Sequence, residues 1–155
     1  MASEDARVDR LRAAGLRVTA PRLAVLDALE ALDGHPDVDD LARDARGRLG
    51  ALSTQAVYDI LAVFVRAGVA RRIQPAGSPA RFEARVGDNH HHVVCRVCGA
   101  TADVDCVPRT APCLDPSSAS AQGFVIDEAE VVFWGRCRRC EASEPRHTIE
   151  EGSSA

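Results

Sequence analysis

The sequence has no lysine, few aromatic residues and no long apolar run. All 19 basic residues are arginine, and aromatic residues make up 4% of the chain, so an apolar core has to be built from leucine, valine and alanine. The longest apolar run, residues 60–65, is far shorter than the roughly 20 residues that span a bilayer. The N-terminal residues are charged and lack the apolar segment of a secretory signal. These absences exclude a membrane or exported protein and predict a cytoplasmic one.

The length and the charge distribution bound the fold and the partner. A chain of 155 residues is long enough for one ordinary domain or two small ones. The net charge of −4 is unevenly spread: residues 1–85 carry 13 arginines against 12 acids, and residues 86–155 carry 6 against 11. The N-terminal half is therefore the better candidate for contact with a polyanion, although an excess of one positive charge is a weak indication.

Capping residues and apolar spacing predict four helices in the N-terminal half. Thr19 precedes Pro21, which suits a first helical turn, and Ser53 is a candidate N-cap. The predicted helices cover residues 6–14, 21–32, 36–49 and 54–67. Two short strands, residues 69–74 and 80–85, follow around a turn. Helices followed by a hairpin are typical of a winged helix-turn-helix domain.

The C-terminal half is predicted to be a small domain rich in strands. Residues 86–89 resemble a linker, and residues 107–121 are too rich in proline and serine for more than a short helix. The candidate strands are residues 92–95 and 100–105, followed by residues 124–126 and 130–134, which form either one longer strand or two. The predicted organisation is a DNA-binding winged-helix domain at residues 1–85, a linker at 86–89, a second domain at 90–142 and a disordered polar tail at 143–155.

Two C-x-x-C pairs predict a structural zinc site. Cys95 and Cys98 form the first pair, and Cys137 and Cys140 form the second. Four thiolates are the number that tetrahedral Zn²⁺ requires, and such a site would join two distant parts of a small domain. The alternatives are two unrelated pairs or a redox dithiol.

A second candidate metal site surrounds a histidine triplet. His90 and His92 share one face of a strand, whereas His91 points away. Other donors with suitable chemistry are His35, Glu83 and Asp103. Imidazole and carboxylate ligands suit Fe²⁺, Mn²⁺ or Ni²⁺ better than an all-sulfur site does. The alternative is a solvated strand, and spacing alone does not bring His35 and Glu83 to this place.

The polar face of the fourth helix is a candidate DNA contact. Thr54, Gln55 and Tyr58 lie on it, and such a face can enter a major groove. Arginines near the N-terminus are candidates for phosphate contacts: Arg7, Arg10, Arg12, Arg17 and Arg22. A solvated helix face is the alternative. Cys106 and Cys113 lie outside both C-x-x-C pairs and are either a redox-active pair, a second metal clip or spare thiols.

Together these residues resemble the ferric uptake regulator (Fur) superfamily. The resemblance covers about residues 8–140 and rests on five stretches: residues 15–22, 55–58, 80–83, 90–99 and 135–140. Residues 85–92 and 127–135 are similar to the FurA/CatR-type branch of high-GC Gram-positive bacteria, whose members typically repress catalase or catalase-peroxidase genes. The resemblance implies a homodimer in which the second domain is an α/β dimerisation domain stapled by the zinc site. It also implies a DNA-binding repressor and not an enzyme.

The resemblance also implies roles for individual residues. The four cysteines of the C-x-x-C pairs match structural zinc ligands. Five residues match regulatory metal ligands that bridge the domains: His35, Glu83, His90, His92 and Asp103. Arg17 matches a minor-groove contact and Tyr58 a major-groove contact. A metal shared by both domains would fix the angle of the two DNA-binding heads on a palindromic operator.

Asp103 bears on what the protein senses. In the peroxide-responsive branch the matching residue is aspartate, and Fe²⁺ with H₂O₂ oxidises nearby histidines, which here would be His35 and His90. The alternatives are a sensor of iron, manganese or nickel level, or a thiol switch. An enzyme such as a deaminase is disfavoured because its H-x-E and P-C-x-x-C patterns are absent.

Overall fold

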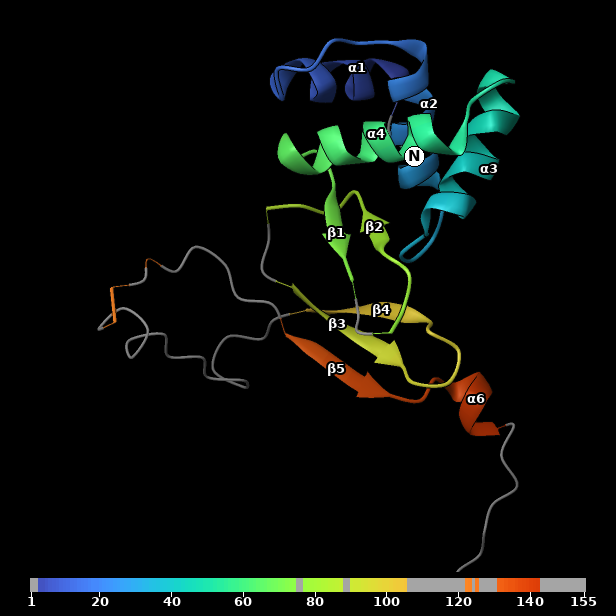
Figure 1. Ribbon diagram of the computed structural model, residues 1–155, viewed down its shortest axis with the longest axis vertical. Helices are drawn as coiled ribbons and strands as arrows, with labels where there is room; N and C mark the ends of the chain where they lie inside the picture. Colours follow the sequence, from blue (N-terminus) through green and yellow to red (C-terminus); the bar gives the residue numbers. More distant parts are fainter. Residues whose placement is uncertain are drawn as a thin grey trace, which may run out of the picture.

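The computed structural model describes residues 3–74, 77–87, 90–105, 122–123, 125 and 131–142. Four helices pack at one end, a hairpin lies beside them, and a three-stranded sheet with a short helix lies beyond the hairpin (Figure 1). This confirms the predicted α+β class, a winged helix-turn-helix unit followed by a small sheet. Three predictions lie outside the described residues: the short helix within 107–121, the tail at 143–155, and the roles of Cys106 and Cys113. Of the predicted strand at 124–126 only Val125 is described, and it is exposed and has no strand assignment.

Each of the first four helices begins at a capping side chain. The helices are α1 (Glu4–Ala13), α2 (Ala20–Ala31), α3 (Val38–Leu49) and α4 (Thr54–Arg66). Thr19 and Ser53 cap α2 and α4 as predicted, each accepting a hydrogen bond from a first-turn backbone N–H. The predicted starts of the other two helices were each displaced by two residues. Ser3 and Asp37 are the caps there, and each turns the chain into the helix one residue later.

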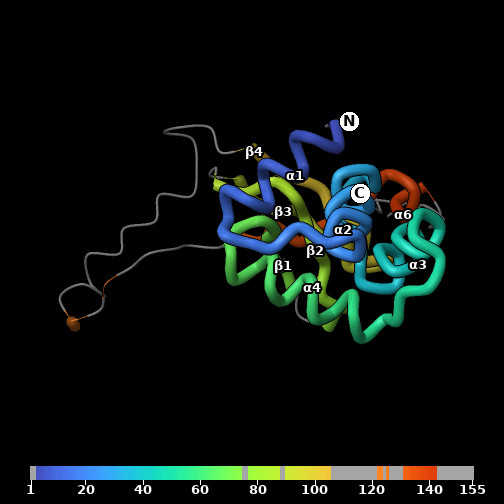
Figure 2. Tube along the Cα trace, turned by 90° about the horizontal axis from the view of Figure 1, so that it is seen from above, coloured from blue at the N-terminus to red at the C-terminus, as the bar shows by residue number. Residues whose placement is uncertain are grey.

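The apolar faces of these helices form the core. α2 lies between α1 and α3 when the molecule is seen from above (Figure 2). The larger side chains buried at these interfaces are Leu11, Val25, Leu26, Leu41, Val57, Leu61 and Phe64. Within the described ranges, no single helix is long and apolar enough to cross a membrane. α3 and α4 pass such a test only as a pair, and the pair is bent by 106°.

The second strand of the hairpin lies beside the loop that precedes α3. β1 (Arg71–Ile73) pairs antiparallel with β2 (Arg81–Glu83). The backbone N–H of Phe82 in β2 donates to the carbonyl of Pro36 at 3.0 Å. Gly34 adopts φ +78°, which favours glycine, at the turn that leads into this loop. His35 is thereby placed beside Glu83.

The second sheet has the strand order β4-β3-β5. It consists of β3 (His90–Cys95), β4 (Thr101–Asp105) and β5 (Val132–Gly135), and α6 (Arg138–Ala142) follows it. β3 is antiparallel to β4 and parallel to β5. β3 begins at His90, two residues earlier than predicted, because His90 already pairs with Asp105. The same register sets His92 opposite Asp103.

Candidate metal centres and DNA-contacting surface

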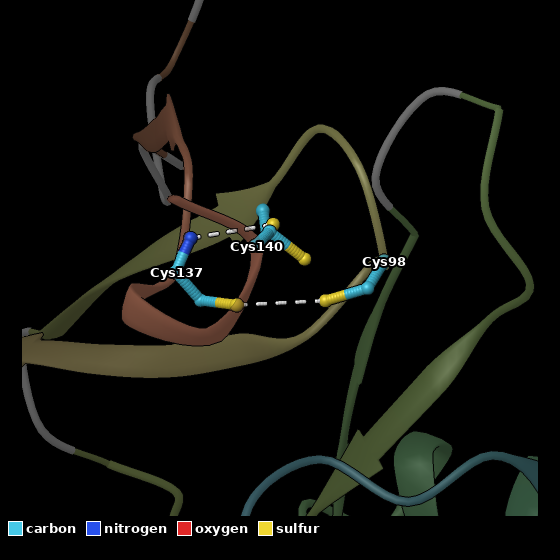
Figure 3. A group of neighbouring side chains, drawn as sticks. Cys98, Cys137 and Cys140 are labelled. Carbon is cyan, nitrogen blue, oxygen red and sulfur yellow. Dashed lines mark hydrogen bonds between the residues drawn. The ribbon is translucent and has the colours of Figure 1, made fainter. Parts of the chain in front are cut away.

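The four cysteines of the C-x-x-C pairs converge at the end of the second sheet. Cys95 ends β3 and Cys98 follows in a tight turn, whereas Cys137 directly precedes α6 and Cys140 lies within it. The parallel pairing of β3 with β5 sets Cys95 beside Gly135, which brings the two pairs together. The four sulfur atoms lie within 4.8 Å of one another, and the Cys98 and Cys137 sulfurs are 3.7 Å apart. Figure 3 shows the sulfurs of Cys98, Cys137 and Cys140 directed toward one another.

The chemistry of this cluster fits a divalent cation. The backbone N–H of Cys137 donates to the Cys95 sulfur at 3.3 Å, and this with further backbone donors lowers the pKa of Cys95 to about 6. Hydrogen bonding with the Cys98 and Cys137 sulfurs raises the pKa of Cys140 to about 12. The sulfurs therefore do not all ionise on their own, because one thiolate opposes the next. A divalent cation such as Zn²⁺ removes that conflict, since a coordinated thiol is deprotonated outright.

A second cluster forms where the helical unit meets the sheet. His35 comes from the loop before α3 and Glu83 from the end of β2. His90 and His92 come from one face of β3, and Asp103 comes from β4. His35, Glu83, His92 and Asp103 have ligating atoms within 4.8 Å of one another. His90 joins them through Glu83. The structure thus brings together all five residues that the family resemblance implies.

Glu83 lies at the centre of this cluster. Its Oε2 is 3.1 Å from Nε2 of His35 and of His90, and 3.5 Å from Nε2 of His92. Asp103 Oδ1 lies 2.9 Å from His35 Nε2. Burial on its own would raise the pKa of Glu83, but the hydrogen bond with His35 and the electrostatic influence of the neighbouring histidines outweigh it and lower the pKa. An ionised Glu83 is the form that binds a cation.

The donors of this cluster also fit a metal ion. Nε2 of His92 is buried and has no hydrogen-bond partner in the described part of the chain, although it faces Glu83 and Asp103. Burial lowers the pKa of His92, so its ring stays neutral and keeps the lone pair that a metal requires. A buried, unpartnered nitrogen is costly unless something binds it. Fe²⁺ and Mn²⁺ suit such mixed nitrogen and oxygen donors.

His91 lies apart from this cluster, as the strand alternation predicts. Its ring packs edge to face against Phe133 of β5 at a centroid distance of 6.2 Å. All three histidines of the triplet are buried, so the alternative of a solvated strand is wrong. Burial of the triplet follows from the central position of β3 in the sheet.

The predicted DNA-contacting side chains lie on an open face of α4. Tyr58 is 51% exposed and Gln55 is exposed next to it. Gln55 donates to Asp59 Oδ1 at 3.0 Å. Thr54 is less accessible, because its hydroxyl accepts a hydrogen bond from Arg46 at 2.7 Å. Arg17 is exposed in the loop that precedes α2.

Two of the arginines suggested as phosphate contacts make ion pairs within the helical unit. Arg7 is 7% exposed and forms ion pairs with Asp27 and Glu30. Arg10 pairs with Glu30 at 3.0 Å and donates to backbone carbonyls. That expectation is therefore wrong for Arg7, which is buried against α2, whereas Arg10 is half-buried and its role in DNA binding stays a prediction. Arg12, which is exposed, keeps its side chain outside the fold.

One residue near the second cluster was missed by sequence reasoning. Arg85 donates to Asp103 Oδ2 at 3.2 Å and to Asp105 Oδ1 at 2.8 Å. The available indication was the alternation of two aspartates on one face of a strand, two residues apart, in a chain with an arginine at the junction of the predicted domains. The pairing itself depends on the tertiary structure.

The fold and its clusters define a class of protein. A winged helix-turn-helix unit, joined to a small sheet by a cluster of imidazole and carboxylate side chains, is the arrangement expected of a metal-responsive transcriptional regulator. The chain belongs to the Ferric uptake regulator family, which matches residues 13–131. Members of this family bind DNA, are typically dimeric and are not enzymes.

Individual relatives agree with this assignment. The transcriptional regulator FurA of Mycobacterium tuberculosis is 52% identical over 136 residues, 88% of this chain and 90% of that protein. The ferric uptake regulator of Pseudomonas aeruginosa, solved with manganese, is 27% identical with a TM-score of 0.62 over 85% of this chain and 98% of that one. The Helicobacter pylori regulator Fur has a TM-score of 0.69 over 93% and 97% at 19% identity, which bears on the fold alone.

Proposed function

We propose that this regulator is a cytoplasmic homodimeric repressor that needs a divalent metal ion to bind a palindromic operator. Its proposed parts are the DNA-binding domain at residues 1–85, the linker at 86–89, the dimerisation domain at 90–142 and the tail at 143–155. Exposed Phe133 and Trp134 on β5, at one edge of the described sheet, support a dimer contact in the second domain.

Structural Zn²⁺ is held by the four clustered cysteines in this proposal: Cys95, Cys98, Cys137 and Cys140. The support is the convergence of four sulfurs within 4.8 Å and the opposed pKa values of Cys95 and Cys140. Such a site joins β3 to α6 and stabilises a domain that has few aromatic side chains.

Regulatory Fe²⁺ or Mn²⁺ is held by the second cluster: His35, Glu83, His90, His92 and Asp103. One observation carries this proposal: donors from both halves of the chain converge on the buried Nε2 of His92, which has no hydrogen-bond partner among the described residues. A bound ion would supply positive charge shared by both domains and, as Fe²⁺, an electron that starts the reduction of peroxide and is returned when the ring is oxidised. Donors held in common fix the angle of the DNA-binding head, and two heads fit a palindrome only at the right spacing.

Operator contacts are assigned to the exposed face of α4 and the loop before α2. Tyr58, Gln55 and Thr54 are proposed to face the major groove, and Arg17 the minor groove. The exposure of Tyr58 and Gln55 supports this assignment. Asp59 beside Gln55 repels phosphate and directs the amide group of Gln55, so the base preference depends on this pair.

Peroxide is the proposed stimulus, and His35 and His90 are its targets. One oxygen atom of H₂O₂ is added to a ring carbon and the other leaves as water. Both rings lie 3.1 Å from Glu83, inside the cluster. An oxidised imidazole is a poorer ligand, so the cluster loses a donor, repression ends, and catalase and other oxidative-stress genes are expressed.

The test begins with the zinc-loaded protein, which is loaded with Fe²⁺ or Mn²⁺ under anaerobic conditions. Its intact mass is then measured after treatment with stoichiometric H₂O₂. The expected result is a gain of oxygen in the Fe²⁺ form alone, which peptide mapping places on His35 or His90. No gain and no thiol loss in either form would make the protein a sensor of iron, manganese or nickel level. Loss of two hydrogens in both forms would indicate a thiol switch, with Cys106 and Cys113 as the first candidates.

A further inference from the structure

Arg85 links the end of the helical unit to the second sheet. It lies two residues after Glu83, in the segment between β2 and β3. Its Nη1 lies 3.2 Å from Asp103 Oδ2 and its Nη2 lies 2.8 Å from Asp105 Oδ1. Asp103 and Asp105 alternate along β4 and therefore share one face. A single guanidinium thus spans two carboxylates of the strand.

Asp103 directs its two oxygens to different partners. Oδ1 lies 2.9 Å from His35 Nε2 and 3.9 Å from His92 Nε2, whereas Oδ2 accepts from Arg85. The Asp103 side chain is 34% exposed, while the other side chains of the cluster are almost fully buried. Packing therefore confines Asp103 least, and its orientation depends on its hydrogen bonds.

The backbone that carries Arg85 is itself held in place. Arg10 of α1 donates through Nη2 to the carbonyl of Ala84, the residue before Arg85, and to the carbonyl of Val69 at 2.7 Å. Arg10 is also paired with Glu30 of α2. Arg85 therefore extends toward Asp103 from a backbone position that the helices fix.

We propose that Arg85 is a positioning residue of the regulatory metal site. It holds Oδ2 of Asp103, keeps Oδ1 directed at the cluster, and so raises the affinity of the site for a divalent cation. This inference rests on the proposed function, in which Asp103 is a ligand. Partners that orient a ligand typically contribute about 10–100-fold to metal affinity. An exposed ion pair adds little to folding stability, so the effect falls on metal binding.

The experiment is a titration of the zinc-loaded protein with Mn²⁺, in which electron paramagnetic resonance monitors the bound ion. Arg85→Gln is expected to weaken Mn²⁺ binding about tenfold and to change the spectrum of the bound ion, with zinc content and Tm unchanged. Arg12→Gln is the matched control. It removes the same charge from an exposed arginine of α1, 3.8 Å from Asp9, and should bind Mn²⁺ as the wild type does.

Two further variants separate positioning from a general effect. In an Asp103→Asn background, Arg85→Gln should cost no additional affinity, because Arg85 acts through Asp103. Arg85→Lys keeps the positive charge but lacks the two guanidinium nitrogens that contact Asp103 and Asp105, so it should lose part of the Mn²⁺ affinity. If Arg85→Gln does not fold, Arg85→Lys decides, and wild-type affinity with an unchanged spectrum overturns the proposal.

The outcomes also distinguish this proposal from the one on which it rests. Wild-type protein that binds no Mn²⁺ beyond its zinc would overturn the regulatory site and the role of Arg85 with it. Wild-type binding that Arg85→Gln leaves within about twofold, well below the range for an orienting partner, would overturn the role of Arg85 alone.

Discussion

At the scale of single residues, Glu83 and the histidines around it decide what the junction can bind. Glu83 is almost fully buried, yet its pKa lies below the usual range because imidazole neighbours outweigh burial. His92 shows the opposite balance, since burial lowers its pKa and keeps its ring neutral. An ionised carboxylate beside a neutral imidazole is a pair of metal donors. Successive side chains of β3 point to opposite faces, so His91 lies on the other face from His90 and His92. A variant of His91 is therefore a matched control for a variant of His92.

Replacing His92 should abolish tight binding at the junction, whereas replacing His91 should not. His92→Ala removes a donor from the cluster. Loss of a residue that only orients a ligand costs about 10–100-fold in metal affinity, so we expect loss of a ligand itself to lower Mn²⁺ affinity by at least about 100-fold. His91→Ala is the control, because its ring packs against Phe133 on the other face. Calorimetric titration of both zinc-loaded variants measures this. Equal losses in the two variants would contradict the assignment of His92.

Acid should destabilise the metal-free protein through two residues of the cluster. The pKa of His92 lies below its ordinary 6.5, so the unfolded chain takes up this proton first and stability falls as the pH drops below 6.5. The pKa of Glu83 lies below its ordinary 4.5, so its contribution is present above 4.5 and is lost as the pH falls through the folded value.

Urea unfolding over this pH range measures the effect, with zinc bound at the cysteine cluster and no metal at the cluster around Glu83. The free energy of unfolding should begin to fall below pH 6.5, the ordinary value of His92. His92→Gln has no such group, so its curve should be flatter in that first interval. Curves that run parallel from pH 6.5 down to 4.5 would show that His92 does not couple to folding.

At the scale of the elements, β3 belongs to both candidate metal centres. Its first residues carry His90 and His92 and its last residue is Cys95. β4 supplies Asp103 on one side, and on the other side β5 leads into α6 with Cys137 and Cys140. A parallel pair such as β3 and β5 has no short turn to hold it, and the cysteine cluster brings side chains from the ends of both strands together.

Loss of zinc should loosen the second sheet before the helical unit. Cys137→Ser removes one of four sulfurs and is expected to release the metal, since structural zinc contributes directly to folding. Hydrogen exchange should then speed up at the Arg96 N–H, which donates to the Gly135 carbonyl at 2.8 Å, while amides of α2 stay protected. Cys106→Ser, outside both C-x-x-C pairs, is the control and should keep its zinc. Uniform exchange in both units would contradict this order.

At the scale of the whole molecule, the junction between the helical unit and the sheet is where binding and DNA recognition meet. The loop before α3 and the end of β2 face β3 and β4 across it (Figure 1). Arg81 of β2 donates to the His35 carbonyl at 2.9 Å and so holds the loop before α3 on the same side of the junction. Binding or loss of a metal ion at this junction is therefore expected to change the orientation of α4, the proposed recognition helix, relative to the second sheet.

Metal and operator should promote each other's binding by the same factor. If Mn²⁺ tightens operator binding by a coupling of about 1–3 kcal/mol, operator DNA must tighten Mn²⁺ binding equally. Fluorescence anisotropy with a palindromic operator, with and without Mn²⁺, gives the first factor, and Mn²⁺ titration of the DNA complex gives the second. Glu83→Gln should reduce both together. A metal effect on DNA binding that persists in Glu83→Gln would place the coupling elsewhere.

The local sequence was sufficient for the helices and for the cysteine pairs. Thr19 and Ser53 cap helices by hydrogen bonds within three residues, and β3 follows the alternation of His90, His91 and His92. Each C-x-x-C pair lies within one turn, so its chemistry is visible from spacing. Such features depend on neighbours along the chain, which is why composition and periodicity predict them.

Tertiary structure alone decided which distant residues meet. His35 reaches Glu83 because β2 pairs with the loop before α3, and Asp103 meets His92 through strand register. Family resemblance implied that set, but spacing did not. The inward turn of Arg7 and the contact of Arg85 with Asp103 had no local pattern to predict them. Contacts between residues far apart in the chain depend on packing, and packing is a property of the whole fold.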